Sequence, residues 1–244
     1  MRLIYLLFLF IGIALTACKT TEPYHAYKGL SDQAIFQRGE QHLKKKHYEA
    51  AVADFEALDV LYPFGPYTQQ AQLDIIYAYY KKGDTDSALA AVDRYIRLYP
   101  AGSGVDYAYY MKGLINMGPP DTWMDHWARS EASQRDTSNI EQAYQDFDLL
   151  IQRYPNSAYA PSAAQHRLQA RDLLAQHQLN IAEYYLRYRA YVAAVNRSVE
   201  LVRQYPGSAQ AASALKIMVI SYHALGEHDL ANQTQQQLDS IHHG

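Results

Sequence analysis

The amino-acid sequence predicts an all-α protein built from repeated helix–turn–helix units. The dipeptide Tyr-Pro occurs four times, at Tyr62, Tyr99, Tyr154 and Tyr205, and each copy closes a segment rich in Ala, Leu, Arg and Gln. Proline cannot continue a helix, so each dipeptide marks the end of one. An alanine stands twelve residues before each of the four prolines, a large residue stands five residues before, and strand signals are absent. The chain is therefore expected to form a helical solenoid.

The recurring alanines and large residues indicate how the helices pack in pairs. A small residue lets a partner helix approach closely, and a bulky residue a turn or two later fills the remaining groove. The alanines are Ala51, Ala88, Ala143 and Ala194, and the large residues are Leu58, Tyr95, Leu150 and Leu201.

The order of these signals defines the repeat. Helices are predicted over 35–45 and 49–61, with His47 and Tyr48 in the turn, and over 70–81 and 86–98, with Gly83 and Asp84 as the stop. Such a unit resembles the tetratricopeptide repeat of ~34 residues. We therefore expect a tetratricopeptide-repeat solenoid over 31–241, with about five units at 32–63, 69–100, 105–155, 160–206 and 208–241. The last unit has Ala231 but no terminal proline, as expected for a C-terminal cap.

Units three and four exceed the repeat length by about 20 and 17 residues. In unit three a helix is predicted over 105–117, and the excess falls in an insertion at 118–139 that contains Trp123 and Trp127. In unit four it becomes one long helix over 162–187, because no Gly or Pro interrupts that segment. The last pair of helices is predicted over 211–225 and 229–241.

The first residues are typical of an export signal. Met1 and Arg2 precede an apolar run over 3–15 that is too short to span a bilayer comfortably. The run ends in Leu15-Thr16-Ala17-Cys18, which resembles the bacterial lipobox. We expect 1–17 to be a lipoprotein signal peptide, Cys18 to be lipidated and 18–30 to be a lipidated tether; an ordinary signal peptide is the alternative. The resemblance to lipoprotein signals, in which an Asp after the cysteine favours retention in the inner membrane, implies sorting to the outer membrane here, because Lys19 holds that position.

Composition and motifs argue against several function classes. Lys and Arg number 22 against 25 Asp and Glu, and this balance does not favour binding of nucleic acid. No HExxH, GxSxG elbow or complete phosphate loop occurs. His223 and His228 are five apart and do not share a helix face. We expect no enzyme activity, no metal and no cofactor.

Several stretches are more specific than the repeat requires, and together they resemble the BamD family. They are Leu61-Tyr62-Pro63-Phe64-Gly65-Pro66-Tyr67, the segment 70–81, Asp93-Arg94-Tyr95-Ile96-Arg97-Leu98, Met111-Lys112-Gly113-Leu114, Arg153-Tyr154-Pro155-Asn156-Ser157, Ala182-Glu183-Tyr184-Tyr185 and the segment 191–197. The resemblance runs from the lipobox to about Leu225.

This resemblance implies a non-catalytic scaffold of the machine that folds β-barrels into the bacterial outer membrane. The family's lipoprotein is anchored to the periplasmic side of that membrane. Its C-terminal repeats dock a POTRA domain of the barrel subunit BamA, its N-terminal repeats receive unfolded outer-membrane proteins, and the lipoprotein BamC lies along it.

Two sets of side chains are candidates for these contacts. Asn196 and Arg197 lie mid-helix beside Ser198, where the repeat pattern predicts a bulky packing residue, and we assign them with Arg187 to the BamA-like partner. The alternative is an ordinary solvated arginine. The aromatic residues Tyr62, Phe64, Tyr67 and Tyr184 are assigned to a substrate or partner peptide. For the first three, the alternative is a purely structural staple between units one and two.

Two other functions compete with this interpretation. Another repeat lipoprotein, such as a pilotin for pilus secretin assembly, would share the lipobox and repeats but lack the Tyr62 to Tyr67 string. A periplasmic cell-wall hydrolase is disfavoured, because almost no chain remains outside the repeats to form a catalytic domain.

Overall fold

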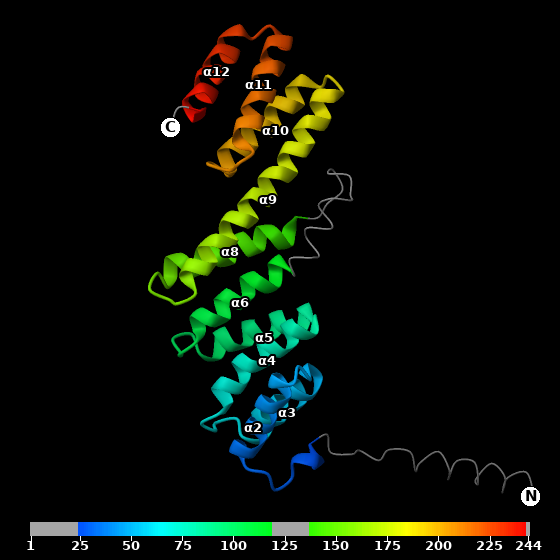
Figure 1. Cartoon of the computed structure of the whole chain (residues 1–244), viewed down its shortest axis with the longest axis vertical. Helices are drawn as coiled ribbons and strands as arrows, with labels where there is room; N and C mark the ends of the chain where they lie inside the picture. Colours follow the sequence, from blue (N-terminus) through cyan, green and yellow to red (C-terminus); the bar gives the residue numbers. More distant parts are fainter. Residues whose placement is uncertain (1–23, 119–136, 243–244) are drawn as a thin grey trace, which may run out of the picture. The chain divides into compact units, whose positions relative to one another are not determined.

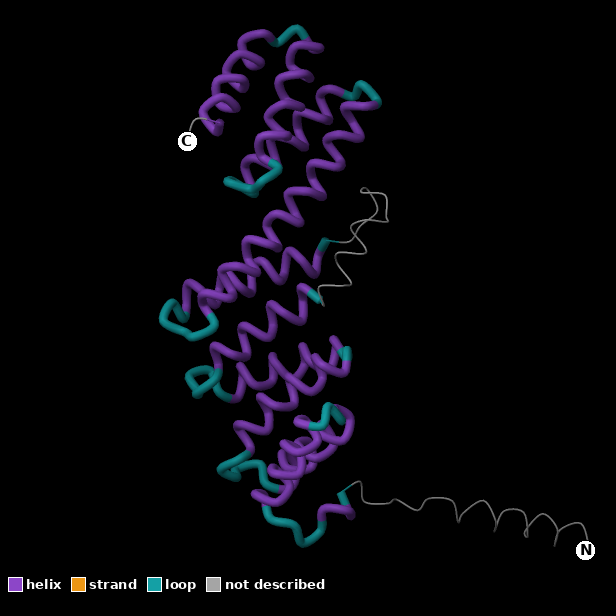
Figure 2. Tube along the Cα trace, viewed as in Figure 1, coloured by secondary structure: helices purple, strands orange, loops and turns teal. Residues whose placement is uncertain are grey.

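The computed structural model describes residues 24–118 and 137–242, and these residues are helical with short connecting turns (Figures 1 and 2). The elements are η1 (His25–Tyr27), α2 (Asp32–Lys44), α3 (Tyr48–Leu61), α4 (Thr68–Lys82), α5 (Thr85–Leu98), α6 (Val105–Met117), α8 (Ser138–Arg153), α9 (Ala160–Arg187), α10 (Tyr191–Gln204), α11 (Ala211–Leu225) and α12 (His228–His242). Within these ranges there is no strand, and no helix is long and apolar enough to cross a bilayer. The expected signal peptide, Cys18, Trp123 and Trp127 lie outside the described residues.

The all-α fold is confirmed, and each predicted helix matches an observed one to within a turn. Two details differ. Tyr48 is the first residue of α3 rather than part of the turn, because His47 occupies the cap position. Helix α8 begins at Ser138, two residues inside the range 118–139 assigned to the insertion.

The four Tyr-Pro dipeptides form the same turn. Tyr62, Tyr99, Tyr154 and Tyr205 each follow the last residue of a helix, with φ of −133, −130, −130 and −122° and ψ of 59, 59, 59 and 58°. Their backbone N–H groups donate to the carbonyl four residues earlier, and their own carbonyls accept from the residue three positions later. The proline that follows lacks an N–H and ends the helix. One sequence signal therefore produces one loop geometry in four places.

The predicted packing positions form the core. Ala51, Ala88, Ala143 and Ala194 are all fully buried, as are Leu58, Tyr95, Leu150 and Leu201, and Ala231 of the last helix is buried too. The small and large residues thus meet the partner helix as their spacing predicts.

The contacts divide the chain into two compact units after Gln72, inside α4. In the first unit α2 packs against α3. In the second, α5 packs on α6, α6 on α8, α8 on α9, α9 on α10, and α11 between α10 and α12.

Helix α9 belongs to two cores of the second unit. Its first half, with Ala160 and Ala163, joins the core that contains Phe147 of α8. Its second half, with Leu174 and Leu179, joins the core formed with α10 and α11. The extra length of the fourth repeat therefore creates one continuous helix that supports α8 along its first half and α10 along its second half.

Candidate functional site

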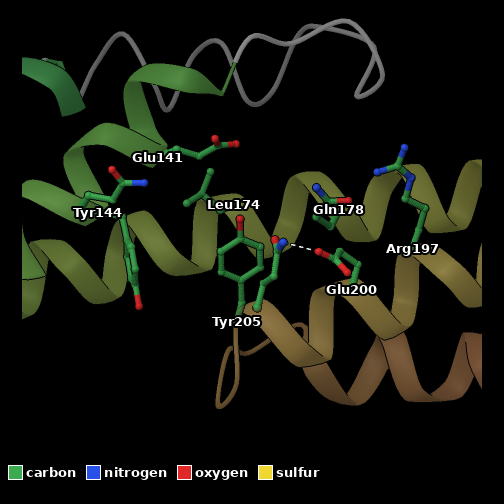
Figure 3. A pocket seen from close by; sticks show the side chains of 9 residues that line it. Glu141, Tyr144, Leu174, Gln178, Arg197, Glu200 and Tyr205 are labelled. Atoms are coloured by element: carbon green, nitrogen blue, oxygen red, sulfur yellow. Dashed lines mark hydrogen bonds between the residues drawn. The ribbon is translucent and has the colours of Figure 1, made fainter.

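A polar groove runs along α9 where α8 and α10 approach each other (Figure 3). It has a volume of about 460 Å³. The lining side chains come from three helices: Glu141, Tyr144 and Gln145 of α8, Leu174 and Gln178 of α9, and Arg197, Glu200 and Gln204 of α10, with Tyr205 at its end. A second hollow of about 430 Å³ continues from it past Arg197 and Glu200 to Tyr185, Ala193 and Asn196.

The groove exists because α9, with 28 residues, is longer than the helices that it supports. Helices α8 and α10 have 16 and 14 residues, so each covers about half of α9. Leu174 lies near the middle of α9 and forms part of the floor between them. The site is therefore a consequence of helix length rather than of a local motif.

The charges of α10 are arranged so that one cation faces the groove without a partner. Glu200 accepts two hydrogen bonds of 2.8 Å from Arg203, and Gln204 also donates to it. Arg197 is exposed and makes no hydrogen bond or ion pair with any residue that the structure describes. In Figure 3 no dashed line reaches the Arg197 side chain, whereas the one that is drawn ends at Glu200 and marks its hydrogen bond from Gln204. The Arg197 guanidinium is thus available to a carboxylate of a partner.

The groove resembles a binding surface rather than a catalytic centre. Burial, with the negative charges of Glu141 and Glu200, raises the pKa of the Tyr205 hydroxyl, which therefore stays protonated near neutral pH and can donate a hydrogen bond.

Across the turn between α11 and α12, the rings of His223 and His228 lie 5.7 Å apart, closer than their spacing suggested. Even so, the described part of the chain holds no group of three His, Cys, Asp or Glu residues suited to a metal.

The three residues assigned to the BamA-like partner lie in one region of the second unit, but not in one hollow. Asn196 and Arg197 share the second hollow and are both exposed. Arg187 is exposed at the last position of α9 and lines neither hollow. The neighbouring Ser198 is fully buried, so the position expected to hold a bulky residue holds a small one.

Tyr184 belongs to an exposed aromatic group at the end of α9. Its ring lies 4.6 Å from that of Tyr188 and 5.7 Å from that of Tyr185, between ring centroids. Tyr188 is 70% exposed, and Tyr185 lines the second hollow. The aromatic group is therefore continuous with the hollow that contains Arg197.

The aromatic string after α3 divides between structural and exposed side chains. The Tyr62 hydroxyl donates to the Leu30 carbonyl at 2.6 Å, and Tyr67 stacks on Phe36 with ring centroids 5.1 Å apart. Phe64 is fully exposed. Tyr62 and Tyr67 thus stabilise the first unit, whereas Phe64 is the member of the string whose whole surface is open to a partner.

Sequence reasoning missed most of the groove. Glu141, Gln145 and Gln178 carry no motif, and they come together because α8 and α10 lie along the same helix. Tyr188 was also missed, although its position just after the long helix was a usable signal.

Comparison with known proteins places these features in a family. The model of the YfiO family, described as outer membrane lipoprotein, matches residues 29–238. The chain belongs to this family. Relatives named outer membrane protein assembly factor BamD include those of Xylella fastidiosa strain 9a5c (35% identical, 93% of this chain and 78% of the relative), Vibrio cholerae (37%, 83% and 84%) and Neisseria meningitidis strain Z2491 (33%, 94% and 88%). The family match includes the groove, Phe64 and the tyrosines at the end of α9.

Proposed function

We propose that this chain is a non-catalytic scaffold for assembly of β-barrel proteins in the outer membrane, anchored on the periplasmic side through lipid on Cys18. The names of its relatives support the assembly role, and the family description supports the lipoprotein assignment. The groove adds a surface that suits binding and has no constellation typical of catalysis.

The observation that carries the docking role is the Arg197 guanidinium beside the polar groove, which pairs with no residue in the described part of the chain. A POTRA domain of the BamA-like barrel subunit is the proposed occupant, with an acidic side chain placed against the Arg197 guanidinium. Asn196 lies one residue away and can donate and accept hydrogen bonds at the same interface. Arg187 contributes from the end of α9, and accessory lipoproteins such as BamC bind elsewhere on the scaffold.

Phe64 carries the proposed substrate role. A fully exposed phenylalanine held between Pro63 and Gly65 offers apolar surface to an extended, aromatic-rich segment of an unfolded outer-membrane protein. Tyr62 and Tyr67 hold the loop that presents it. Tyr184 provides a second aromatic contact in the other unit of the chain.

Purification of the lipoprotein from outer membranes in mild detergent, followed by mass spectrometry of what accompanies it, tests this proposal. We expect stoichiometric recovery of a large β-barrel protein with periplasmic repeat domains. Recovery of the chain alone, or with a pilus secretin or cell-wall enzymes, would contradict the assembly role and support another repeat lipoprotein.

A further inference from the structure

The segment before α2 is held firmly against the first helical pair. The Tyr27 hydroxyl donates to Asp54 of α3 at 3.1 Å, and the Arg38 guanidinium of α2 lies over the Tyr27 ring at 4.5 Å. Arg38 and His42 also contact the Asp54 carboxylate, each at 2.8 Å. Because Asp54 is 2% exposed, this cluster fixes where the N-terminal segment meets the fold.

The contacts also give the direction of this segment along α3. The Leu30 carbonyl accepts from Tyr62 at the C-terminal end of α3, whereas Tyr27 reaches Asp54, eight residues earlier in the helix. Followed backwards, the chain therefore runs towards the N-terminal end of α3. Asp54 is six residues beyond Tyr48, the first residue of α3, so Tyr27 contacts α3 ~9 Å along the helix from the turn that joins α2 and α3.

That turn is strongly basic. Lys44, Lys45 and Lys46 are consecutive and exposed, and none forms an ion pair with a described residue. Lys28, which follows Tyr27 in the sequence, is also exposed. Glu40 and Glu49 flank the turn in sequence, but neither forms an ion pair with the three lysines, and the carboxylate of Asp54 is buried and paired with Arg38.

The chain length between Cys18 and Tyr24, where the described residues begin, limits how far the basic turn can lie from a membrane. Tyr24 is the sixth residue after Cys18, and a chain of six residues spans at most ~22 Å in any conformation. The charged ends of three lysine side chains extend further from the fold, and electrostatic attraction acts over ~8 Å at physiological salt. The turn can therefore meet the bilayer surface while the lipid is inserted.

We propose that Lys44, Lys45 and Lys46 form a second membrane contact that binds the anionic headgroups of phospholipids and sets the orientation of the first repeat above the bilayer. The inference rests on the proposed lipidation of Cys18. Acyl chains supply the anchor, and clustered lysines beside an anchor add attraction to anionic lipid that salt weakens. These lysines pair with no described residue, and the contacts of Tyr27 with Asp54 and Arg38 keep their turn near the anchor, so the cluster fits that task.

The test uses the full lipidated chain in vesicles and a fluorophore at the turn. Cys18 is the one cysteine of the sequence, and lipidation consumes its thiol, so His47→Cys supplies a unique site for a thiol-reactive dye. His47 is exposed and its side chain does not cap α3. Quenching of the dye by a headgroup-labelled lipid reports how close the turn lies to the surface.

We expect several-fold stronger quenching in vesicles with about one third phosphatidylglycerol than in purely zwitterionic vesicles. It should fall when salt is raised from about 0.1 M to about 1 M, which shortens the screening length from ~10 to ~3 Å. In the triple variant Lys44→Gln, Lys45→Gln, Lys46→Gln, quenching should be the same in anionic and in zwitterionic vesicles. The matched variant Lys81→Gln, Lys82→Gln, Lys216→Gln removes equal charge elsewhere and should keep the difference.

Two failures can be told apart. If the protein is acylated and bound to vesicles but the dye is quenched equally with anionic and zwitterionic lipid, the membrane contact is wrong and the anchor stands. The same holds if the triple lysine variant is quenched as strongly as the natural chain. A mature N-terminal peptide without acyl chains, detected by mass spectrometry, overturns the anchor and this inference together.

Discussion

At the residue scale, Arg197 differs from its counterparts in the other repeats. Nine residues before the Tyr-Pro proline, α3 has Asp54 and α8 has Asp146, both buried and hydrogen-bonded, whereas α5 has Ala91. At this position α10 has Arg197, which is exposed and unpaired among the described residues. An exposed cation thus stands where the first and third repeats have a buried, structural carboxylate, and this difference supports our proposal that Arg197 contacts a partner.

Charge reversal at Arg197 tests this role. Arg197→Glu places a second carboxylate beside Glu200 and repels an acidic partner, so we expect capture of the barrel subunit to weaken about tenfold or more. Helicity by circular dichroism should not change, because the side chain is exposed and makes no contact that the fold needs. Arg97→Glu, at another exposed arginine on α5, is the matched control and should bind normally. Unaltered capture by Arg197→Glu would exclude it as a contact.

Phe64 and Tyr67 are expected to respond differently to truncation. Phe64→Ala removes a fully exposed ring, so thermal stability should stay unchanged while affinity for an extended aromatic-rich peptide from an unfolded barrel falls about fivefold or more. Tyr67→Ala removes the stacking on Phe36 and should lower the melting temperature. Fluorescence anisotropy of the labelled peptide and a thermal scan measure the two effects. Equal peptide affinity for Phe64→Ala and the natural chain would contradict the substrate role.

At the element scale, facing positions of paired helices complement each other in size. A Cβ added to Gly39 would lie 2.5 Å from the ring of Phe55, and one added to Gly113 would lie 2.5 Å from the ring of Phe147. The same positions hold Ile76 and Val92 in the second repeat, and Ala182 and Ser198 in the fourth, all fully buried. Ser198 therefore faces a small partner, which explains why no bulky residue is needed there.

This complementarity predicts a coupled effect in the third repeat. Gly113→Ala should destabilise the protein by about 1–3 kcal/mol, because the ring of Phe147 must move. Phe147→Leu alone should also destabilise it, by leaving a cavity. The double variant should lose less unfolding free energy than the two single variants lose together, by a coupling energy of about 0.5–3 kcal/mol. Denaturant unfolding measures this. Additive effects would contradict the pairing of α6 with α8 through these residues.

The sequence predicted the helices better than the site, and the reason is physical. Helix ends and packing positions repeat locally, so the Tyr-Pro turns and the buried alanines could be predicted from spacing. The partner of Phe147 could not be predicted from spacing. Gly39 precedes Phe55 by 16 residues, whereas Gly113 precedes Phe147 by 34. The groove depends on three helices and on the length of α9, which no single motif encodes.

At the scale of the molecule, the second unit is a row of helices that each pack mainly on their neighbours, and its cores become smaller towards the C-terminus. The first core joins α4 to the beginning of α9, and the next joins the end of α9 to α11. The last consists of Leu215 and Met218 of α11 with Leu238 of α12. In such an array each repeat is stabilised by its neighbours, so a terminal helix with one neighbour opens most easily.

Hydrogen exchange of the intact chain should therefore show graded protection. We expect amides of α12 to exchange first and those in the middle of α9 last, because α9 contributes to two cores. Leu238→Ala should raise exchange in α12 and along the Leu215 side of α11, since it removes a buried side chain worth about 2–5 kcal/mol. Exchange in α6 and α8 should stay as it was, because their core does not include Leu238. If α12 and α8 exchanged at one rate in both proteins, the second unit would unfold as a single cooperative body, and the groove along α9 could not persist while the C-terminal helix opens.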